Sequence, residues 1–92
     1  MGEESLLQAR VIDDLQSCGW IVHKVVLSSK EGWTDLEAFR KKIAIFIECK
    51  AKGKKAAPLQ EYRHEQLRGQ GFDVFVIDTW ALYQKLKPKY FV

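Results

Sequence analysis

The feature that most constrains this chain is the segment at residues 43–50, Ile-Ala-Ile-Phe-Ile-Glu-Cys-Lys. Its β-branched and aromatic residues favour a strand, and side chains along a strand alternate between the two faces of a sheet. The odd positions therefore share one face and are expected to build a core: Ile43, Ile45, Ile47 and Cys49. Glu48 and Lys50 lie side by side on the other face. Two charges at the end of an apolar strand predict a polar site there.

A second strand is predicted at residues 35–40, joined to the first through Lys41-Lys42. If these two lysines form a two-residue turn, Asp35 lies opposite Glu48. Opposed carboxylates, with Cβ atoms about 5 Å apart, repel each other, so one pKa rises or a cation is recruited. A hard divalent ion such as Mg²⁺ typically uses one or two carboxylates. A longer turn would instead place Asp35 on the other face.

The rest of the chain predicts an α/β fold in the order α-β-β-β-α-β-α. Gly19 and Gly71 are helix stops, Pro58 suits a first helical position, Thr79 can cap a helix and Pro88 is expected to end it. Successive strands favour antiparallel hairpins, and a helix between strands favours a parallel crossover, so a mixed sheet flanked by helices is expected. The predicted helices are 3–18, 58–70 and 80–87, and the predicted strands are 20–28, 35–40, 43–50 and 72–78.

Length and charge narrow the class of protein. The 92 residues suit one domain, 1–92, and no apolar run is long enough to span a membrane. Net charge is +3, with nine basic and five acidic groups in residues 47–92 against six and seven in residues 1–46. Lys52, Lys54 and Lys55 form a basic loop that suits a phosphate backbone, although a solvated connector has the same composition. Cys18 and Cys49 without an export signal indicate reduced cysteines and a cytoplasmic protein.

Three short motifs, taken in order, resemble a known family. They are Gly32-Trp33-Thr34-Asp35, Glu48-Cys49-Lys50 and Pro58-Leu59-Gln60. They are similar to the G-x-x-D, E-x-K and Q elements of the virus-type replication-repair nuclease family (VRR-Nuc), within the PD-(D/E)XK superfamily. The resemblance implies a restriction-endonuclease-like core and Mg²⁺- or Mn²⁺-dependent cleavage of DNA. It also implies a homodimer that acts on branched DNA such as four-way (Holliday) junctions, in a bacterial or phage-infected cell.

The resemblance also implies a role for each motif residue. Asp35 and Glu48 would bind the metal, with the backbone carbonyl of Cys49 as a third ligand. Lys50 would position or activate the attacking water and offset charge on the phosphate. Gln60 would orient Lys50 or the phosphate.

The first helix departs from the family pattern. Where the family usually has a glutamate, this chain has Gln8, and Glu4 lies one turn earlier on the same helix face. Either Gln8 substitutes, or Glu4 reaches the site, or a second metal site is weakened. Trp33 and Thr34 also replace a small residue and a proline, and Trp33 is close enough to the predicted site to contact DNA.

Other functions remain open at this level. A non-catalytic nucleic-acid-binding module on the same fold is compatible with Gln8, and a sequence-specific restriction-type nuclease would usually carry extra recognition segments. The histidines, His23 and His64, lack zinc-ligand spacing with the cysteines and are interpreted as ordinary hydrogen-bonded or surface residues. The apolar tail at residues 90–92 would either fold back on its own core or contact a second copy, and dimerisation is the interpretation preferred here.

Overall fold

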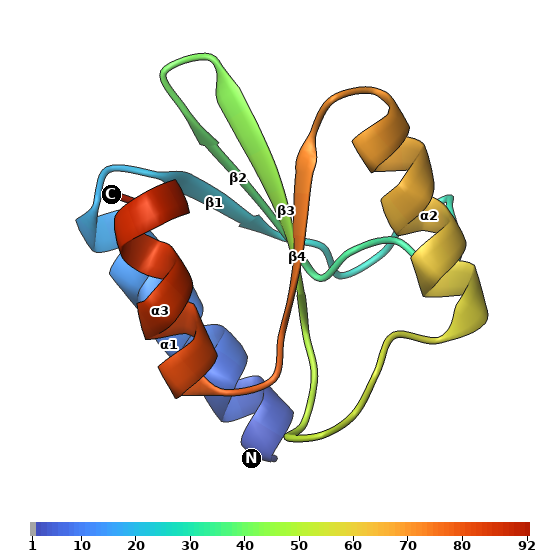
Figure 1. Cartoon of the computed structure of the whole chain (residues 1–92), viewed down its shortest axis with the longest axis horizontal. Coiled ribbons are helices and arrows are strands. Elements are labelled where there is room, and N and C mark those ends of the chain that lie inside the picture. The colour runs from blue at the N-terminus through green and yellow to red at the C-terminus, as the bar shows by residue number, and fades with distance from the viewer. Residues whose placement is uncertain (1) are drawn as a thin grey trace.

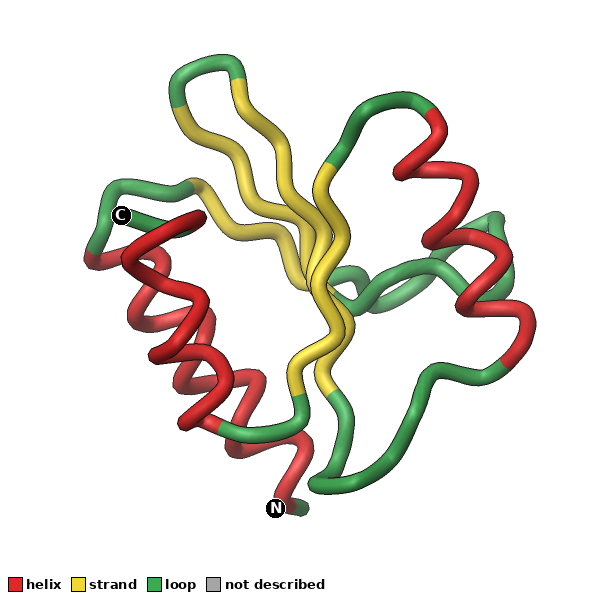
Figure 2. The backbone as a smooth tube through the Cα atoms, viewed as in Figure 1, coloured by secondary structure: helices red, strands yellow, loops and turns green. Residues whose placement is uncertain are grey.

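The computed structural model describes residues 2–92 and has the predicted order of elements. In Figures 1 and 2 the sheet separates α2 from α1 and α3, which lie together on the other side. None of the helices in this range is long and apolar enough to cross a membrane. The elements are α1 (Glu3–Ser17), β1 (Ile21–Lys24), β2 (Leu36–Arg40), β3 (Ile43–Cys49), α2 (Pro58–Gly69), β4 (Asp73–Ile77) and α3 (Trp80–Tyr90).

The sheet has the order β1-β2-β3-β4, with β4 parallel to β3 and the other pairs antiparallel. Arg40 pairs with Ile43, so the turn between β2 and β3 has two residues. Lys41 and Lys42 take positive φ values of 51° and 69°, as a tight hairpin turn of this kind requires. Continued by one residue, this register puts Asp35 opposite Glu48, as the two-residue turn predicted.

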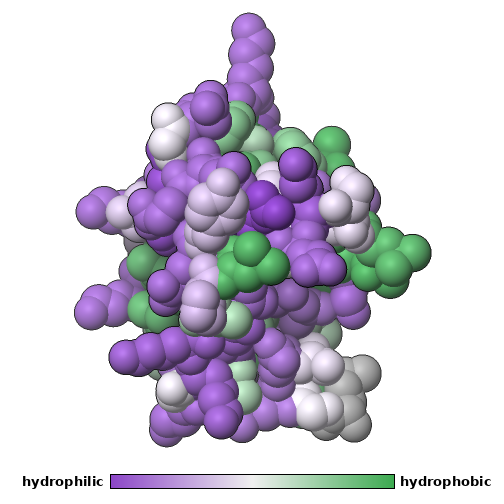
Figure 3. Space-filling view, turned by 90° about the vertical axis from the view of Figure 1, so that its right-hand side faces the viewer, coloured by the Kyte–Doolittle hydropathy of each residue, from purple (hydrophilic) through white to green (hydrophobic). Residues whose placement is uncertain are grey.

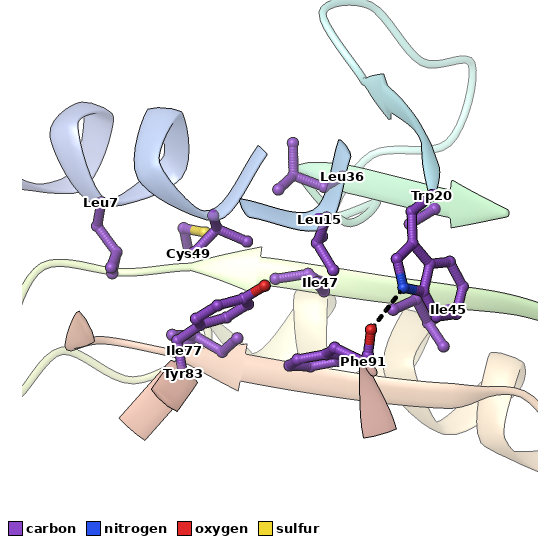
Figure 4. Packing of buried hydrophobic residues seen from close by; sticks show 12 residues of the cluster. Leu7, Leu15, Trp20, Leu36, Ile45, Ile47, Cys49, Ile77, Tyr83 and Phe91 are labelled. Carbon is purple, nitrogen blue, oxygen red and sulfur yellow. Dashed lines mark hydrogen bonds between the residues drawn. The ribbon is translucent and has the colours of Figure 1, made fainter. Parts of the chain in front are cut away.

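The main core fills the space between the sheet and the pair α1 and α3 (Figure 4). The odd positions of β3 contribute to it as expected, except Ile43, which is 55% exposed. Ile43 directly follows the hairpin turn and pairs with Arg40, and at this end of the sheet it lies outside the core cluster. The fully or nearly fully buried members of this core are Leu7, Val11, Leu15, Trp20, Leu36, Ala38, Ile45, Ile47, Cys49, Ile77, Tyr83 and Phe91.

The end of the chain differs from the prediction, because α3 continues through Pro88 to Tyr90. Proline removes one backbone donor and is costly inside a helix, so the packing that follows must offset its effect. Phe91 is fully buried and stacks on Tyr83 with ring centroids 5.2 Å apart. Its carbonyl accepts a 2.9 Å hydrogen bond from the indole of Trp20. The tail therefore folds back onto its own core, and the use of this tail as an argument for a dimer was wrong.

The first strand is shorter than predicted. β1 ends at Lys24, which pairs with Leu36, the first residue of β2. Beyond this pair only the amide of Val25 is held, by the carbonyl of Asp35 at 2.8 Å. Leu27 is 92% exposed, and residues 25–28 form a loop despite their strand-like composition.

Candidate active site

Glu48 is the centre of a polar cluster at the end of β3. Its side chain is only 1% exposed, although it carries a carboxylate. Three segments surround it: the loop that ends at Asp35, the residues that follow β3, and the first two turns of α2. The side chains around Glu48 are Asp35, Lys50, Gln60 and His64.

Gly32 allows the loop to bring Asp35 to this position. Its φ is +77°, which L side chains rarely adopt, and a Cβ would come within 2.8 Å of Leu59 on α2. Glycine is thus needed both for the backbone conformation and for the close approach to α2. Asp35 is then anchored by its Oδ2, which accepts a 2.8 Å hydrogen bond from the amide of Cys49.

We predict that Gly32→Ala lowers the free energy of unfolding by about 2–4 kcal/mol, since backbone strain and overpacking add. Gly53→Ala is the matched control. Gly53 also has positive φ, +79°, but nothing lies within 4 Å of its added Cβ, so strain alone acts. Urea unfolding of both variants measures the difference. Equal losses would show that the contact with Leu59 is unimportant.

The two oxygens of Glu48 have different surroundings. Oε2 accepts a 3.2 Å hydrogen bond from the Gln60 amide and lies 3.7 Å from the Lys50 ammonium. Oε1 has no hydrogen-bond partner and lies 3.6 Å from Nε2 of His64, which has none either. Burial, and then the neighbouring Asp35 carboxylate, raise the pKa of Glu48 to about 8 against the opposing effect of Lys50.

This raised pKa predicts an unusual dependence of stability on pH in the presence of chelator. The folded chain keeps a proton on Glu48 up to about pH 8, whereas the unfolded chain loses it near 4.5, so stability falls as pH rises between these values. Burial and then Arg68 lower the pKa of His64 below its ordinary 6.5, which acts in the opposite direction at lower pH. The clearest window is therefore about pH 7–8.

In this window the thermal midpoint of the wild-type chain should fall with rising pH, and Glu48→Gln should remove the slope. Since glutamine needs no proton, the variant should also be the more stable protein at pH 8. A wild-type slope equal to that of Glu48→Gln would contradict the assignment of the raised pKa.

Gln60 is oriented by the start of α2. Its Oε1 accepts a 2.8 Å hydrogen bond from the amide of Ala57, which leaves its Nε2 as the donor to Glu48. Ala57 has no side-chain acceptor, so this is half of a reciprocal cap, and Pro58 fills the first helical turn. Gln60 therefore both caps the start of α2 and holds the carboxylate of Glu48.

The donor set around Glu48 fits a hard divalent cation. Two carboxylates face each other, and a buried carboxylate oxygen lacks a partner. Within residues 2–92 no three side chains of histidine, cysteine, aspartate or glutamate form a metal cluster. Backbone oxygens and water would have to complete the shell, as Mg²⁺ commonly requires. The Cys49 side chain lies in the main core and burial raises the pKa of its thiol to about 12, which confines any role at the site to its backbone.

The first helix contributes to the electrostatics of the site. Glu4 is exposed, and its charge is close enough to raise the pKa of both Glu48 and Cys49. Gln8 is half-buried one turn further along α1. Glu4 therefore adds to the negative charge at the site.

The basic loop after β3 is held by carboxylates. The amide of Lys52 donates to Glu3 at 3.1 Å, and that of Gly53 donates to Asp78 at 3.1 Å. The side chains of Lys52, Lys54 and Lys55 are exposed. Figure 3 shows the side of the molecule on which α2 lies, where the surface is mostly hydrophilic with apolar side chains in separate groups.

Trp33 is partly buried beside the site. Its indole N–H donates to Glu37 at 2.9 Å, and its ring meets Phe46 edge-on with centroids 6.0 Å apart. Trp33 therefore packs against a smaller core cluster under α2, which is formed by Phe46, Leu67 and Val74.

His64 is the residue at this site that sequence reasoning missed. It was interpreted as an ordinary histidine, yet it is 1% exposed and faces Glu48. Its spacing was the available signal, because residues four apart on a helix share a face and Gln60 was already assigned to the site.

Comparisons with known proteins identify relatives of this chain. No family model matches the sequence. A phage protein named "Putative nuclease p44", from Acyrthosiphon pisum secondary endosymbiont phage 1, is 32% identical over 80 residues, which cover 86% of each chain. A solved structure described as a VRR_NUC domain has a TM-score of 0.89 and 26% identity, covering 98% of this chain and 99% of that chain.

The fold and these relatives define a nuclease. With similarity over nearly its whole length, the chain belongs to the VRR-Nuc family. The resemblance drawn from the three sequence motifs and the expected fold class are both confirmed.

Proposed function

We propose that this nuclease is a metal-dependent, structure-selective endonuclease that hydrolyses phosphodiester bonds in branched DNA such as four-way junctions. The observation that carries the proposal is the buried Glu48, which faces Asp35 and lies 3.7 Å from Lys50. A buried carboxylate with a raised pKa is an unfavourable feature unless a cation neutralises it. The proposed cation is Mg²⁺ or Mn²⁺.

Each residue of the cluster has a proposed task. Asp35 and Glu48 hold the cation, which when bound acts as a Lewis acid on the phosphate and its attacking water. Lys50 contacts the phosphate and orients the water, so that attack is in line and developing negative charge is offset. Gln60 keeps Glu48 in place through its 3.2 Å hydrogen bond.

The basic loop is proposed to hold the DNA backbone. We predict that replacing Lys52, Lys54 and Lys55 with alanine weakens binding to all DNA shapes alike, because phosphate contacts carry no sequence information. The slope of log K against log salt should become shallower by about 2–3, close to one unit per lost phosphate contact. Filter binding at several salt concentrations measures this slope. An unchanged slope would indicate that the loop only connects β3 to α2 and does not bind phosphates.

A homodimer is proposed for the same function. A four-way junction has near two-fold symmetry and needs two cuts on opposing strands, which two related active centres supply. The apolar residues Ile21 and Phe39, paired across β1 and β2 and 72% and 40% exposed, are available for a contact between copies. Light scattering with and without junction DNA distinguishes dimer from monomer.

The second candidate is a non-catalytic DNA-binding module, favoured by Gln8 in place of an acidic residue. Labelled four-way, flap and linear duplexes incubated with Mg²⁺, Mn²⁺ or chelator separate the possibilities. The proposed function expects metal-dependent cuts in branched substrates, within a bacterial or phage-infected cytoplasm in vivo. Binding without cleavage would support the module, and cutting of linear duplex at fixed sequences would support a restriction-type nuclease.

A further inference from the structure

His64 and Glu48 present two buried polar atoms to each other without a hydrogen bond. Nε2 of His64 lies 3.6 Å from Oε1 of Glu48, both residues are 1% exposed, and neither atom has a partner. Folded proteins leave few buried polar atoms unpaired, because such an atom gives up its hydrogen bonds to water without a replacement. Two such atoms that face each other therefore require an explanation.

A small movement would pair them. An N–H···O hydrogen bond is made at about 2.7–3.2 Å, so an approach of about half an ångström is sufficient. A neutral imidazole carries one N–H, which can lie on either ring nitrogen. Placed on Nε2, this hydrogen points to the free oxygen of Glu48.

The other oxygen of Glu48 is already held. Oε2 receives Gln60 and lies near Lys50. A hydrogen bond from His64 to Oε1 would mean that each of the two carboxylate oxygens is held by a donor from α2. Each carboxylate oxygen accepts about two hydrogen bonds or ligands, so capacity for a cation remains.

We propose that His64 is a positioning residue for the metal site: its Nε2–H donates to Oε1 of Glu48 and holds this carboxylate in place for the cation that Asp35 shares. Hydrogen bonds to metal-binding carboxylates orient them, and their loss typically weakens metal affinity. The inference rests on the proposed function, since it assigns His64 a role only if Glu48 binds a metal.

Three variants separate this role from simple packing. His64→Leu keeps much of the buried volume but removes the donor. His64→Gln keeps an amide donor near the position of Nε2, whereas His64→Asn places its donor nearer to that of Nδ1. Leu67→Ala is the control, because Leu67 packs α2 onto the smaller core cluster and is 8% exposed.

The experiment is a calorimetric titration of the full chain with Mn²⁺, together with thermal unfolding in chelator. His64→Leu should weaken Mn²⁺ affinity about 10–100-fold, and His64→Gln should restore it to within about threefold of wild type. His64→Asn should behave like the leucine variant, which keeps the test available if His64→Leu fails to fold. Leu67→Ala should lower the thermal midpoint and leave affinity unchanged.

Two results would overturn the inference alone: wild-type affinity in His64→Leu or His64→Asn, or an equal loss of affinity in Leu67→Ala. The first would show that the donor is unnecessary, and the second that any loosening of α2 has the same effect. A wild-type chain that binds no Mn²⁺ would overturn the proposed function and this inference with it.

Discussion

Cleavage by Glu48→Gln and by Asp35→Asn should fall by on the order of 10⁴-fold at a metal concentration that saturates the wild-type chain, with binding to four-way junctions largely retained. Each change removes one of the two charges proposed to hold the cation and leaves the side-chain volume nearly constant. Single-turnover cleavage and a gel-shift assay on the same preparations measure the two effects.

Glu37→Gln is the matched control for these variants. Glu37 lies on β2 two residues after Asp35 and shares its face of the strand, but its carboxylate contacts the indole of Trp33. The control loses the same charge from the same strand face and should keep activity within about threefold of wild type, as expected of a residue outside the reacting group. Near wild-type cleavage by Glu48→Gln or Asp35→Asn would show that the site has been assigned wrongly.

Lys50→Ala should lower cleavage by about 10²–10³-fold, comparable to the loss of one hydrogen-bond donor to developing charge. Mn²⁺ affinity should be retained, because the ammonium lies 3.7 Å from Glu48 and competes with the cation for the same carboxylate. Lys85→Ala, at an exposed position of α3, provides a control with the same charge change. If Lys50→Ala lost metal binding, the lysine would be holding the site together and would have no direct part in the reaction.

The hairpin and its carboxylate pair could be predicted because local rules determine them. A two-residue turn fixes the register of a hairpin, and the register fixes which residues face each other. Glu48 was conspicuous because it follows an apolar run on a strand. Asp35 then followed from the pairing alone.

Other features could not be predicted because tertiary packing decides them. Pro88 is a helix-ending residue by local preference, but the burial of Phe91 and its bond to Trp20 hold α3 together past it. Residues 25–28 have strand composition but lack a partner, since β2 begins at Leu36. Nothing in the sequence around His64 distinguishes it from an ordinary helix residue. Only the packing of α2 on the sheet shows that it faces Glu48.

The most direct test of the account is a Mn²⁺ titration of the wild-type chain by calorimetry at pH 7, in two buffers of different ionisation enthalpy. Glu48, with its pKa raised to about 8, is mostly protonated at this pH, so binding of a cation must displace the proton. We expect Mn²⁺ binding that releases close to one proton and that Asp35→Asn and Glu48→Gln both remove. Absence of binding, or binding that survives both substitutions, would contradict it.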